Sequence, residues 1–270
     1  MSIALQVALV MVTILVVLLV IGAPIGVAIG MSSAVSMICM IPADVSFATS
    51  AQRIFAGSNS FSLIAIPFFI LAGNIMNNGG IATRLVNCAK VISGRMPGAL
   101  AQSNVVANML FGAISGSGAA AAAAMGGTIG PLEEKEGYDK NYSTAVNVAS
   151  APVGMLIPPS NTMIVYSSVA GSVSIAALFM AGYIPGLLWG GAVMILAGIM
   201  AKKRGYQAEQ RVPVKVALKT FWQAIPSLLL IVIVIGGILG GIFTATEGSA
   251  IAVVYATVLS LIYKAFKIKD

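Results

Sequence analysis

The sequence contains no histidine and only two cysteines, Cys39 and Cys88, which lie far apart. Isolated thiols without histidine cannot build a familiar zinc site or a Cys/His catalytic arrangement. The acidic residues all fall in or beside predicted loops, so the sequence predicts neither acid–base chemistry nor a carboxylate proton relay within a membrane. We therefore expect free thiols without a redox role, no metal site apart from the sodium ion discussed below, no organic cofactor and no enzymatic activity.

Charge is scarce as well. Only 9% of the 270 residues are charged and 59% are hydrophobic, whereas soluble domains carry roughly 25% charged residues. The stretches 3–21, 22–43 and 225–246 contain no charged residue, and each approaches the ~20 residues that a helix needs to cross a bilayer. The composition predicts an all-α integral membrane protein.

The formal net charge is +7, but it does not indicate nucleic-acid binding. The basic residues sit in short loops between apolar runs, which is the pattern that orients membrane proteins. No Lys or Arg precedes Arg53, so the charged n-region of a secretory signal peptide is not predicted.

The apolar runs predict a multi-span helical bundle with one anomalous segment. The expected spans are 3–21, 24–41, 61–79, 144–168, 175–200, 222–242 and 247–263. The segment 98–130 instead divides into two short apolar pieces, 99–114 and 119–130, around a Ser-Gly-Ser-Gly sequence. Neither piece reaches ~20 residues, which favours a re-entrant hairpin. Two short full crossings would place the ends on the same side and stay an alternative.

The basic residues test this topology. With both hairpin ends on one side, 14 of the 15 basic residues share a face and only Arg53 lies opposite, whereas a single span at 98–130 would give 12 and 3. The positive-inside rule then predicts a periplasmic N-terminus and a cytoplasmic C-terminus, with residues 139 and 207 cytoplasmic and residue 44 periplasmic. The shared face carries Arg84, Lys90, Arg95, Lys135, Lys140, Lys202, Lys203, Arg204, Arg211, Lys215, Lys219, Lys264, Lys267 and Lys269.

Two loops have the pattern of amphipathic helices lying on the membrane surface. In 212–225, apolar residues recur at helical spacing with Lys215 and Lys219 on another face. The pattern in 80–94 is weaker, and ordinary solvated loops are the alternative. Near the C-terminus, Glu247 is expected in the first turn of a helix capped by Thr244 or Thr246.

The segment 151–162, with three prolines and a glycine in the middle of an expected span, predicts a broken helix. Unwound backbone at that depth is tolerated only in a protein interior or beside a cavity. Freed carbonyls there can bind Na⁺, and helix N-termini beside them favour an anion. A proline kink without a ligand is the alternative.

The hairpin tip is the second candidate, because its glycines permit close backbone approach and its hydroxyls can contact a ligand. Small-residue helix packing is the alternative here. Asn104 and Asn108, one turn apart, could line the same cavity or form interhelical hydrogen bonds. The predicted sodium ligands are Ser115, Ser117, Gly154, Pro158, Ser160 and Asn161, and the predicted substrate contacts are Gly116, Gly118, Asn108 and Thr162.

These motifs resemble the large membrane subunit of tripartite ATP-independent periplasmic (TRAP) transporters. The resemblance lies in 111–117 (FGAISGS), 151–160 (APVGMLIPPS), 241–247 (GIFTATE) and 22–26 (GAPIG), and similarity extends through essentially the whole chain. The Ser-Asn-Thr sequence at 160–162 also resembles a signature of sodium-coupled dicarboxylate transporters, which have a related elevator architecture.

The resemblance implies a bacterial inner-membrane protein that imports organic acids, such as C4-dicarboxylates or sialic acid, with a Na⁺ gradient. It also implies a periplasmic substrate-binding protein and a small membrane subunit as partners. The family fold has two inverted repeats, each with a hairpin and a broken helix, in a transport domain that slides against a scaffold linked by surface arm helices.

On this basis 1–97 would hold scaffold helices and the first arm, and 98–170 the hairpin and broken helix. Residues 171–221 would hold a span and the second arm, and 222–270 the last spans with the start of a second repeat. Because the family's large subunit continues well past this length, we expect the remainder of that subunit as a partner, and the chain alone to be unstable or inactive. An elevator-type anion transporter without a binding protein and a structural membrane subunit without a ligand are the alternatives.

Overall fold

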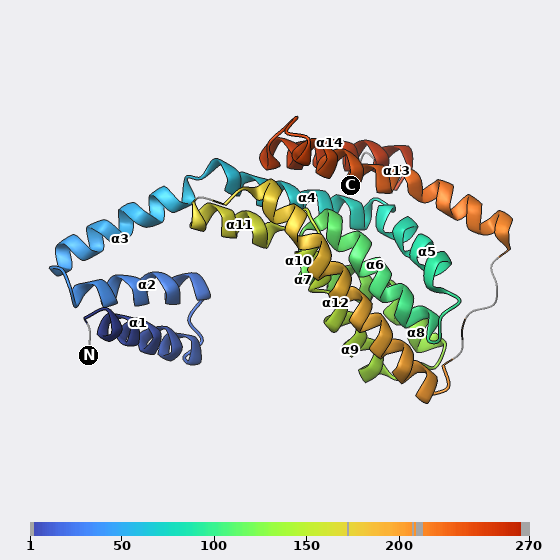
Figure 1. Ribbon diagram of the computed structural model, residues 1–270, viewed down its shortest axis with the longest axis horizontal. Coiled ribbons are helices and arrows are strands. Elements are labelled where there is room, and N and C mark those ends of the chain that lie inside the picture. The colour runs from blue at the N-terminus through green and yellow to red at the C-terminus, as the bar shows by residue number, and fades with distance from the viewer. Residues whose placement is uncertain (1–2, 172, 207, 209–212, 266–270) are drawn as a thin grey trace. The chain divides into compact units, whose positions relative to one another are not determined.

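The computed structural model describes residues 3–171, 173–206, 208 and 213–265, and their regular structure is entirely helical (Figure 1). Five stretches of these residues are long and apolar enough to cross a membrane, and a bent helix pair would make a sixth. The five are Ile3–Val20, Phe61–Asn78, Ile175–Lys203, Val214–Leu239 and Ala245–Ile262. The prediction of an all-α, multi-span membrane protein is thus confirmed. Arg211, Lys267, Lys269 and residue 207, which the topology argument used, lie outside the described residues.

The chain divides into two compact units, Met1–Ser60 and Phe61–Asp270. In the first unit, α1 (Ile3–Val20) and α2 (Ile25–Ile38) pack against each other. Gly22, at φ +88°, forms the turn between them together with Pro24. α1 has no fully buried residue. Val7, Val10, Ile14, Leu15 and Leu18 are partly covered, and its other side chains are exposed.

The third helix of this unit, α3 (Ala43–Ser58), was not predicted from the sequence. It follows Pro42 and carries Asp44 in its first turn, two features that are common at helix starts. The buried Ser46 hydroxyl donates a hydrogen bond to the Ala34 carbonyl at 2.7 Å, which ties α3 to α2.

In the second unit, η1 (Phe61–Ile64) runs into α4 (Ala65–Asn78), and α5 (Ile81–Ser93) follows. The helix expected at 80–94 is therefore present. One face of α5 is fully buried through Ile81 and Leu85, because α5 packs against α4, α6 and α13.

Three long helices complete the second unit: α12 (Ile175–Lys203), α13 (Val214–Leu239) and α14 (Ala245–Ile262). The surface helix expected at 212–225 and the span expected at 222–242 are not separate elements, because α13 runs continuously through both. Pro226 lies inside α13 without ending it, since proline removes only one backbone hydrogen-bond donor. α14 begins as predicted, with Thr244 and Glu247 forming a capping box.

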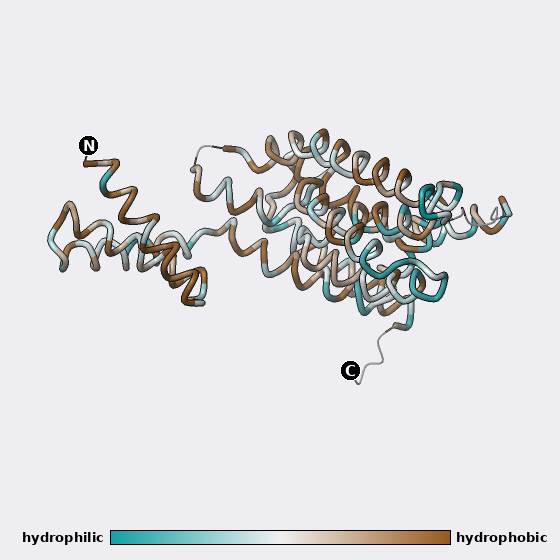
Figure 2. Tube along the Cα trace, turned by 90° about the horizontal axis from the view of Figure 1, so that it is seen from below, coloured by the Kyte–Doolittle hydropathy of each residue, from teal (hydrophilic) through white to brown (hydrophobic). Residues whose placement is uncertain are grey.

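Hydrophilic residues of the second unit gather at the end where α8 (Gly130–Lys135) and the C-terminus of α12 lie (Figures 1 and 2). There Arg204 forms an ion pair with Asp139 at 3.1 Å. Tyr206 stacks on Tyr138 with ring centroids 4.2 Å apart, and its hydroxyl accepts a hydrogen bond from the Asp139 N–H. The region following the hairpin is thus fastened to the end of α12.

Candidate functional site

The anomalous segment forms a helical hairpin of α6 (Ala99–Ser115) and α7 (Gly118–Thr128). At 1.5 Å per residue, α7 spans only about 17 Å, well short of the ~30 Å hydrocarbon core. This length favours the re-entrant hairpin over two full crossings. Gly116 ends α6 with a left-handed φ of +63°, and Ser117 caps α7 by accepting a hydrogen bond from the Ala120 N–H.

The expected span at 144–168 is broken, as the prolines predicted. It consists of α9 (Lys140–Ser150), the single turn α10 (Val153–Leu156) and α11 (Asn161–Ala170). The axis of Lys140–Leu156 and the axis of Asn161–Ala170 differ in direction by 46°. The backbone between Leu156 and Asn161 is not helical, so peptide groups there are available for other contacts.

The hairpin lies directly against this break. A Cβ added to Gly154 would lie 2.6 Å from the Gly112 Cα, so no side chain fits where α6 crosses α10. A Cβ added to Gly118 would lie 2.9 Å from the Ala151 carbonyl oxygen. The Asn161 N–H, at the start of α11, donates a hydrogen bond to the Gly116 carbonyl at 3.1 Å. The two segments that the sequence singled out separately therefore form one structure.

Two helix N-termini meet at this point, because α7 and α11 both begin beside the hairpin tip. Each is capped by a serine in extended conformation, Ser117 and Ser160. The Ser160 hydroxyl also donates a 2.6 Å hydrogen bond to the Met155 carbonyl and so holds the two halves of the break together. The capping role occupies part of the bonding capacity of both serines and leaves each oxygen one further lone pair.

Neutral oxygens gather where the tip meets the break. Asn161 Oδ1 is buried and has no hydrogen-bond partner among the described residues. A Cβ on Gly116 would lie 3.2 Å from this oxygen and 3.1 Å from the Pro159 carbonyl oxygen. The buried Ser115 hydroxyl makes a long 3.4 Å hydrogen bond to the Ser117 carbonyl. An unpartnered amide oxygen beside carbonyls and a hydroxyl suits a hard monovalent cation.

The remaining predicted sodium and substrate residues are Gly154, Pro158, Thr162 and Asn108, and they do not share one environment. Gly154 contacts α6 directly, and Pro158 belongs to the non-helical stretch beside it. Thr162 is exposed and borders a cavity of about 400 Å³ that is otherwise lined mainly by apolar residues such as Leu156, Met163 and Leu178.

Asn108 is fully buried between α6 and α9. Its side-chain nitrogen is within hydrogen-bond distance of Asn104 Oδ1 (2.7 Å), Asn147 Oδ1 (3.0 Å) and Ser150 Oγ (2.8 Å). Asn147 in turn donates to the Ala122 carbonyl on α7. Of the two readings of Asn104 and Asn108, the structure shows interhelical hydrogen bonding, and Asn104 also borders a cavity.

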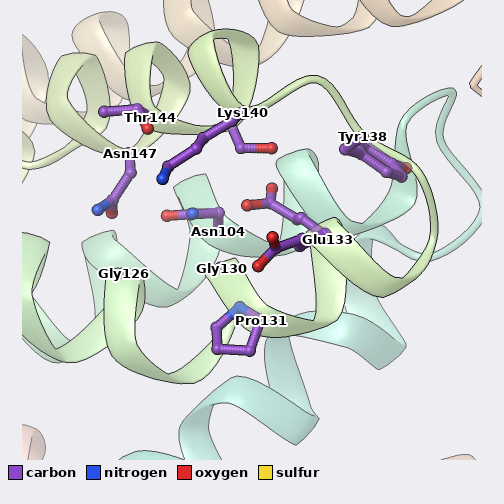
Figure 3. A pocket seen from close by; sticks show the side chains of 11 residues that line it. Asn104, Gly126, Gly130, Pro131, Glu133, Tyr138, Lys140, Thr144 and Asn147 are labelled. Atoms are coloured by element: carbon purple, nitrogen blue, oxygen red, sulfur yellow. The ribbon is translucent and has the colours of Figure 1, made fainter.

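That cavity, of about 360 Å³, contains the residue that sequence reasoning missed, Glu133 (Figure 3). Glu133 falls in a predicted loop, yet it is 0% exposed and neither carboxyl oxygen has a hydrogen-bond partner among the described residues. Loss of hydration raises the pKa of this carboxyl to about 7, and the nearby Ser143 hydroxyl opposes the shift only partly.

Comparison with known proteins supports one family. Residues 12–270 match the family described as the DctM component of the tripartite ATP-independent periplasmic transporter. The chain is 54% identical over 233 residues to the protein YgiK of Salmonella typhimurium, covering 86% of this chain and 54% of YgiK.

Two relatives from Vibrio cholerae are named for their substrates. One is the C4-dicarboxylate TRAP transporter large permease protein DctM, 42% identical over 79% of this chain and 47% of its own length. The other is the sialic acid TRAP transporter large permease protein SiaM, 40% identical over 79% of this chain and 50% of its own length.

The chain spans about half the length of these curated relatives. The two Vibrio cholerae relatives are transporter permeases and not enzymes. On the family match and the fold together, the chain belongs to the large permease (DctM) component of the TRAP transporters.

Proposed function

We propose that this chain contributes one sodium-binding hairpin and broken helix to a TRAP transporter that imports an organic acid. The observation that carries the proposal is the contact between the hairpin tip and the break, where Asn161 Oδ1 is buried without a hydrogen-bond partner among the residues that the structure describes. The ligands to Na⁺ would be this amide oxygen, the hydroxyls of Ser115, Ser117 and Ser160, and carbonyls of the stretch from Gly154 to Pro158.

The same geometry supports binding of an organic acid beside the ion. The N-termini of α7 and α11 present N–H groups and positive dipole ends at the tip, where a carboxylate is favoured. Gly116, Gly118, Asn108 and Thr162 are the residues assigned to the substrate. The first three are buried against the break and α9, so the tip would have to separate from the break for an acid to reach them. No Lys or Arg lies in the hairpin or in the break, so binding would be releasable.

The substrate class is an organic acid, such as a C4-dicarboxylate or sialic acid, the two compounds named for the Vibrio cholerae relatives. The two relatives are almost equally similar to this chain, so overall identity favours neither acid. A periplasmic binding protein would deliver the acid, and the small permease subunit and the remainder of the large subunit would complete the transporter in the bacterial inner membrane.

We propose a periplasmic N-terminus and a cytoplasmic C-terminus. Arg204 at the end of α12 pairs with Asp139, directly before Lys140, and Lys202 lies in the last turn of α12. These basic residues therefore gather at one end of the second unit, which supports this orientation. An impermeant thiol reagent should label a cysteine at Asp44 from outside intact cells but not one at Glu134, in a background without Cys39 and Cys88. Labelling of both from outside would contradict the orientation.

The test of function is substrate uptake against sodium concentration in the complete transporter with its periplasmic protein. Asn161→Ala and Ser115→Ala should each raise the sodium concentration needed for half-maximal uptake, because each removes a neutral oxygen from the site. Ser168→Ala is the matched control, since Ser168 lies on α11 with its hydroxyl bonded to the Ile164 carbonyl. Unchanged sodium dependence in both site variants would mean that these residues only pack.

A further inference from the structure

Glu133 has no role in the sodium site, and its burial needs a separate explanation. It lies on α8, immediately after the returning helix of the hairpin. Its side chain is completely covered, and both carboxyl oxygens lack a hydrogen-bond partner among the described residues. An ionised carboxylate in that situation is destabilised, because burial removes its hydration and supplies no countercharge, and the nearby Ser143 hydroxyl offsets this only partly.

No residue facing the carboxyl supplies the missing positive charge. The neighbours from α6 and α7 are uncharged, namely Asn104 and Gly126. α9 contributes Lys140, Tyr142 and Ser143. The loop between α8 and α9 contributes Tyr138, and α8 itself contributes Glu134. Lys140 is the one cation of this set. It points into the same cavity but forms no ion pair with Glu133 in the described part of the chain (Figure 3).

A neutral, protonated carboxyl fits these surroundings much better. Asn104 Nδ2 and Ser143 Oγ are likewise buried without partners in the described residues, and both border the same cavity. A carboxylic acid offers one donor and acceptor oxygens, which complement an amide N–H and a hydroxyl. A neutral carboxyl can be satisfied by these groups directly or through a water bound in the cavity.

The carboxyl is also connected to the elements that build the sodium site. Asn104 accepts a hydrogen bond from Asn108, which also contacts Asn147 and Ser150 on α9. Ser150 is the last residue of α9, directly before the break. A continuous set of buried polar side chains therefore runs from the Glu133 cavity between α6 and α9 to the start of the broken segment.

We propose that Glu133 is a proton-binding site, and that its bound proton is required for the closed packing of α8 and α9 against α6. Ionisation of the carboxyl would favour entry of water or of the Lys140 ammonium, either of which requires the cavity to open. Because the hairpin and α9 share this cavity, opening it would disturb the contact between the tip and the break. The proton would thereby favour the arrangement in which the hairpin is seated.

The pH dependence follows from the raised pKa of Glu133, about 7 in the folded protein against an ordinary 4.5. Between these values the folded protein keeps a proton that the unfolded chain has released, so stability falls as pH rises through this window and is level above it. The melting temperature of the complete transporter should therefore drop by several degrees between pH 5 and pH 8 through this residue.

The experiment compares the wild type with Glu133→Gln and the control Glu136→Gln, an exposed carboxylate directly after α8 that does not border the cavity. Glu133→Gln keeps the shape of the neutral acid, so it should lose the Glu133-dependent fall in melting temperature while Glu136→Gln retains it. Infrared difference spectra between pH 5 and pH 8 should show a protonated carboxyl band in the wild type that Glu133→Gln lacks. Uptake should fall from pH 6 to pH 8 in the wild type and stay level in Glu133→Gln.

Three results would overturn the proposal. Identical pH profiles and infrared spectra for the wild type and Glu133→Gln would show that Glu133 does not titrate in this range. A Glu133-dependent stability change that follows sodium concentration and not pH would assign the cavity to a metal cation. Equal pH dependence of uptake in both proteins would leave Glu133 as a packing residue without coupling to transport. None of these results decides the proposed sodium site, because that site is tested separately by the sodium dependence of uptake in Asn161→Ala.

Discussion

The hairpin tip buries neutral oxygens, whereas the Glu133 cavity, formed in part by the same hairpin, buries a carboxyl group. At the tip, capping serines and one backbone hydrogen bond satisfy most polar groups, and Asn161 Oδ1 is the buried side-chain oxygen left over. In the cavity, both Glu133 oxygens, Asn104 Nδ2 and Ser143 Oγ have no hydrogen-bond partner within the described part of the chain. An unpartnered amide oxygen suits a weakly held cation, whereas an unpartnered carboxyl group suits a proton.

The two regions also differ in how closely the backbone packs. At the tip, glycines bring the α6 and α10 backbones into direct contact, so the geometry has little tolerance. The cavity has a volume of about 360 Å³ and borders the exposed Lys140. This difference predicts that small steric changes act at the tip and that changes of charge act at the cavity.

The largest effect is expected for Gly154→Ala. The new methyl group would meet the Gly112 backbone, which cannot move aside as a side chain could, and overpacking of this kind costs about 1–3 kcal/mol. The variant should melt at lower temperature and lose most uptake. Gly127→Ala on α7 is the control, because no atom lies within 4 Å of its added Cβ. Equal melting temperatures and uptake in the two variants would show that the close contact between the Gly154 and Gly112 backbones is not required.

An intermediate effect is expected for Ser160→Ala. The substitution removes the cap of α11 and the hydrogen bond to the Met155 carbonyl, and loss of a serine cap costs about 1 kcal/mol. The melting temperature should fall by less than in Gly154→Ala, and the sodium concentration needed for half-maximal uptake should rise, because the lost hydroxyl is also a proposed sodium ligand. A lower melting temperature with unchanged sodium dependence would mean that the serine acts as a cap alone.

The smallest effect is expected for Asp139→Asn, close to the cavity. It removes the ion pair with Arg204, in which both side chains are 42% exposed, while asparagine can still cap α9. The melting temperature should stay within measurement error of the wild type and be insensitive to salt. A loss as large as that of Ser160→Ala would show that this ion pair contributes more than its exposure suggests.

The sequence predicted the tip and the break because glycine, serine and proline change local backbone preferences wherever they occur. The Ser-Gly-Ser-Gly sequence at 115–118 and the prolines at 152, 158 and 159 therefore marked the helix ends closely. The sequence also suggested that the two segments would share a site, on the analogy of transporter midplane sites.

The remaining features depend on tertiary packing, which residue patterns do not encode locally. Glu133 lies among four charged residues in 133–136, which is the pattern of a solvated loop, and only the packing of α6, α7 and α9 around it makes it buried. The continuity of α13 was missed because the basic residues Lys215 and Lys219 suggested a separate surface helix. Burial of a single side chain on a short helix leaves no periodic signal in the sequence.

The central claim is that sodium holds the hairpin tip against the broken helix, and the reactivity of a cysteine beside the tip tests it most directly. Ala119 is exposed in the first turn of α7, so Ala119→Cys, in a background without Cys39 and Cys88, should react readily with a thiol reagent. In the complete transporter, sodium should slow this labelling whereas potassium or choline should not, and Asn161→Ala should abolish the protection. Labelling that is independent of sodium, in a transporter whose uptake still requires sodium, would contradict the account.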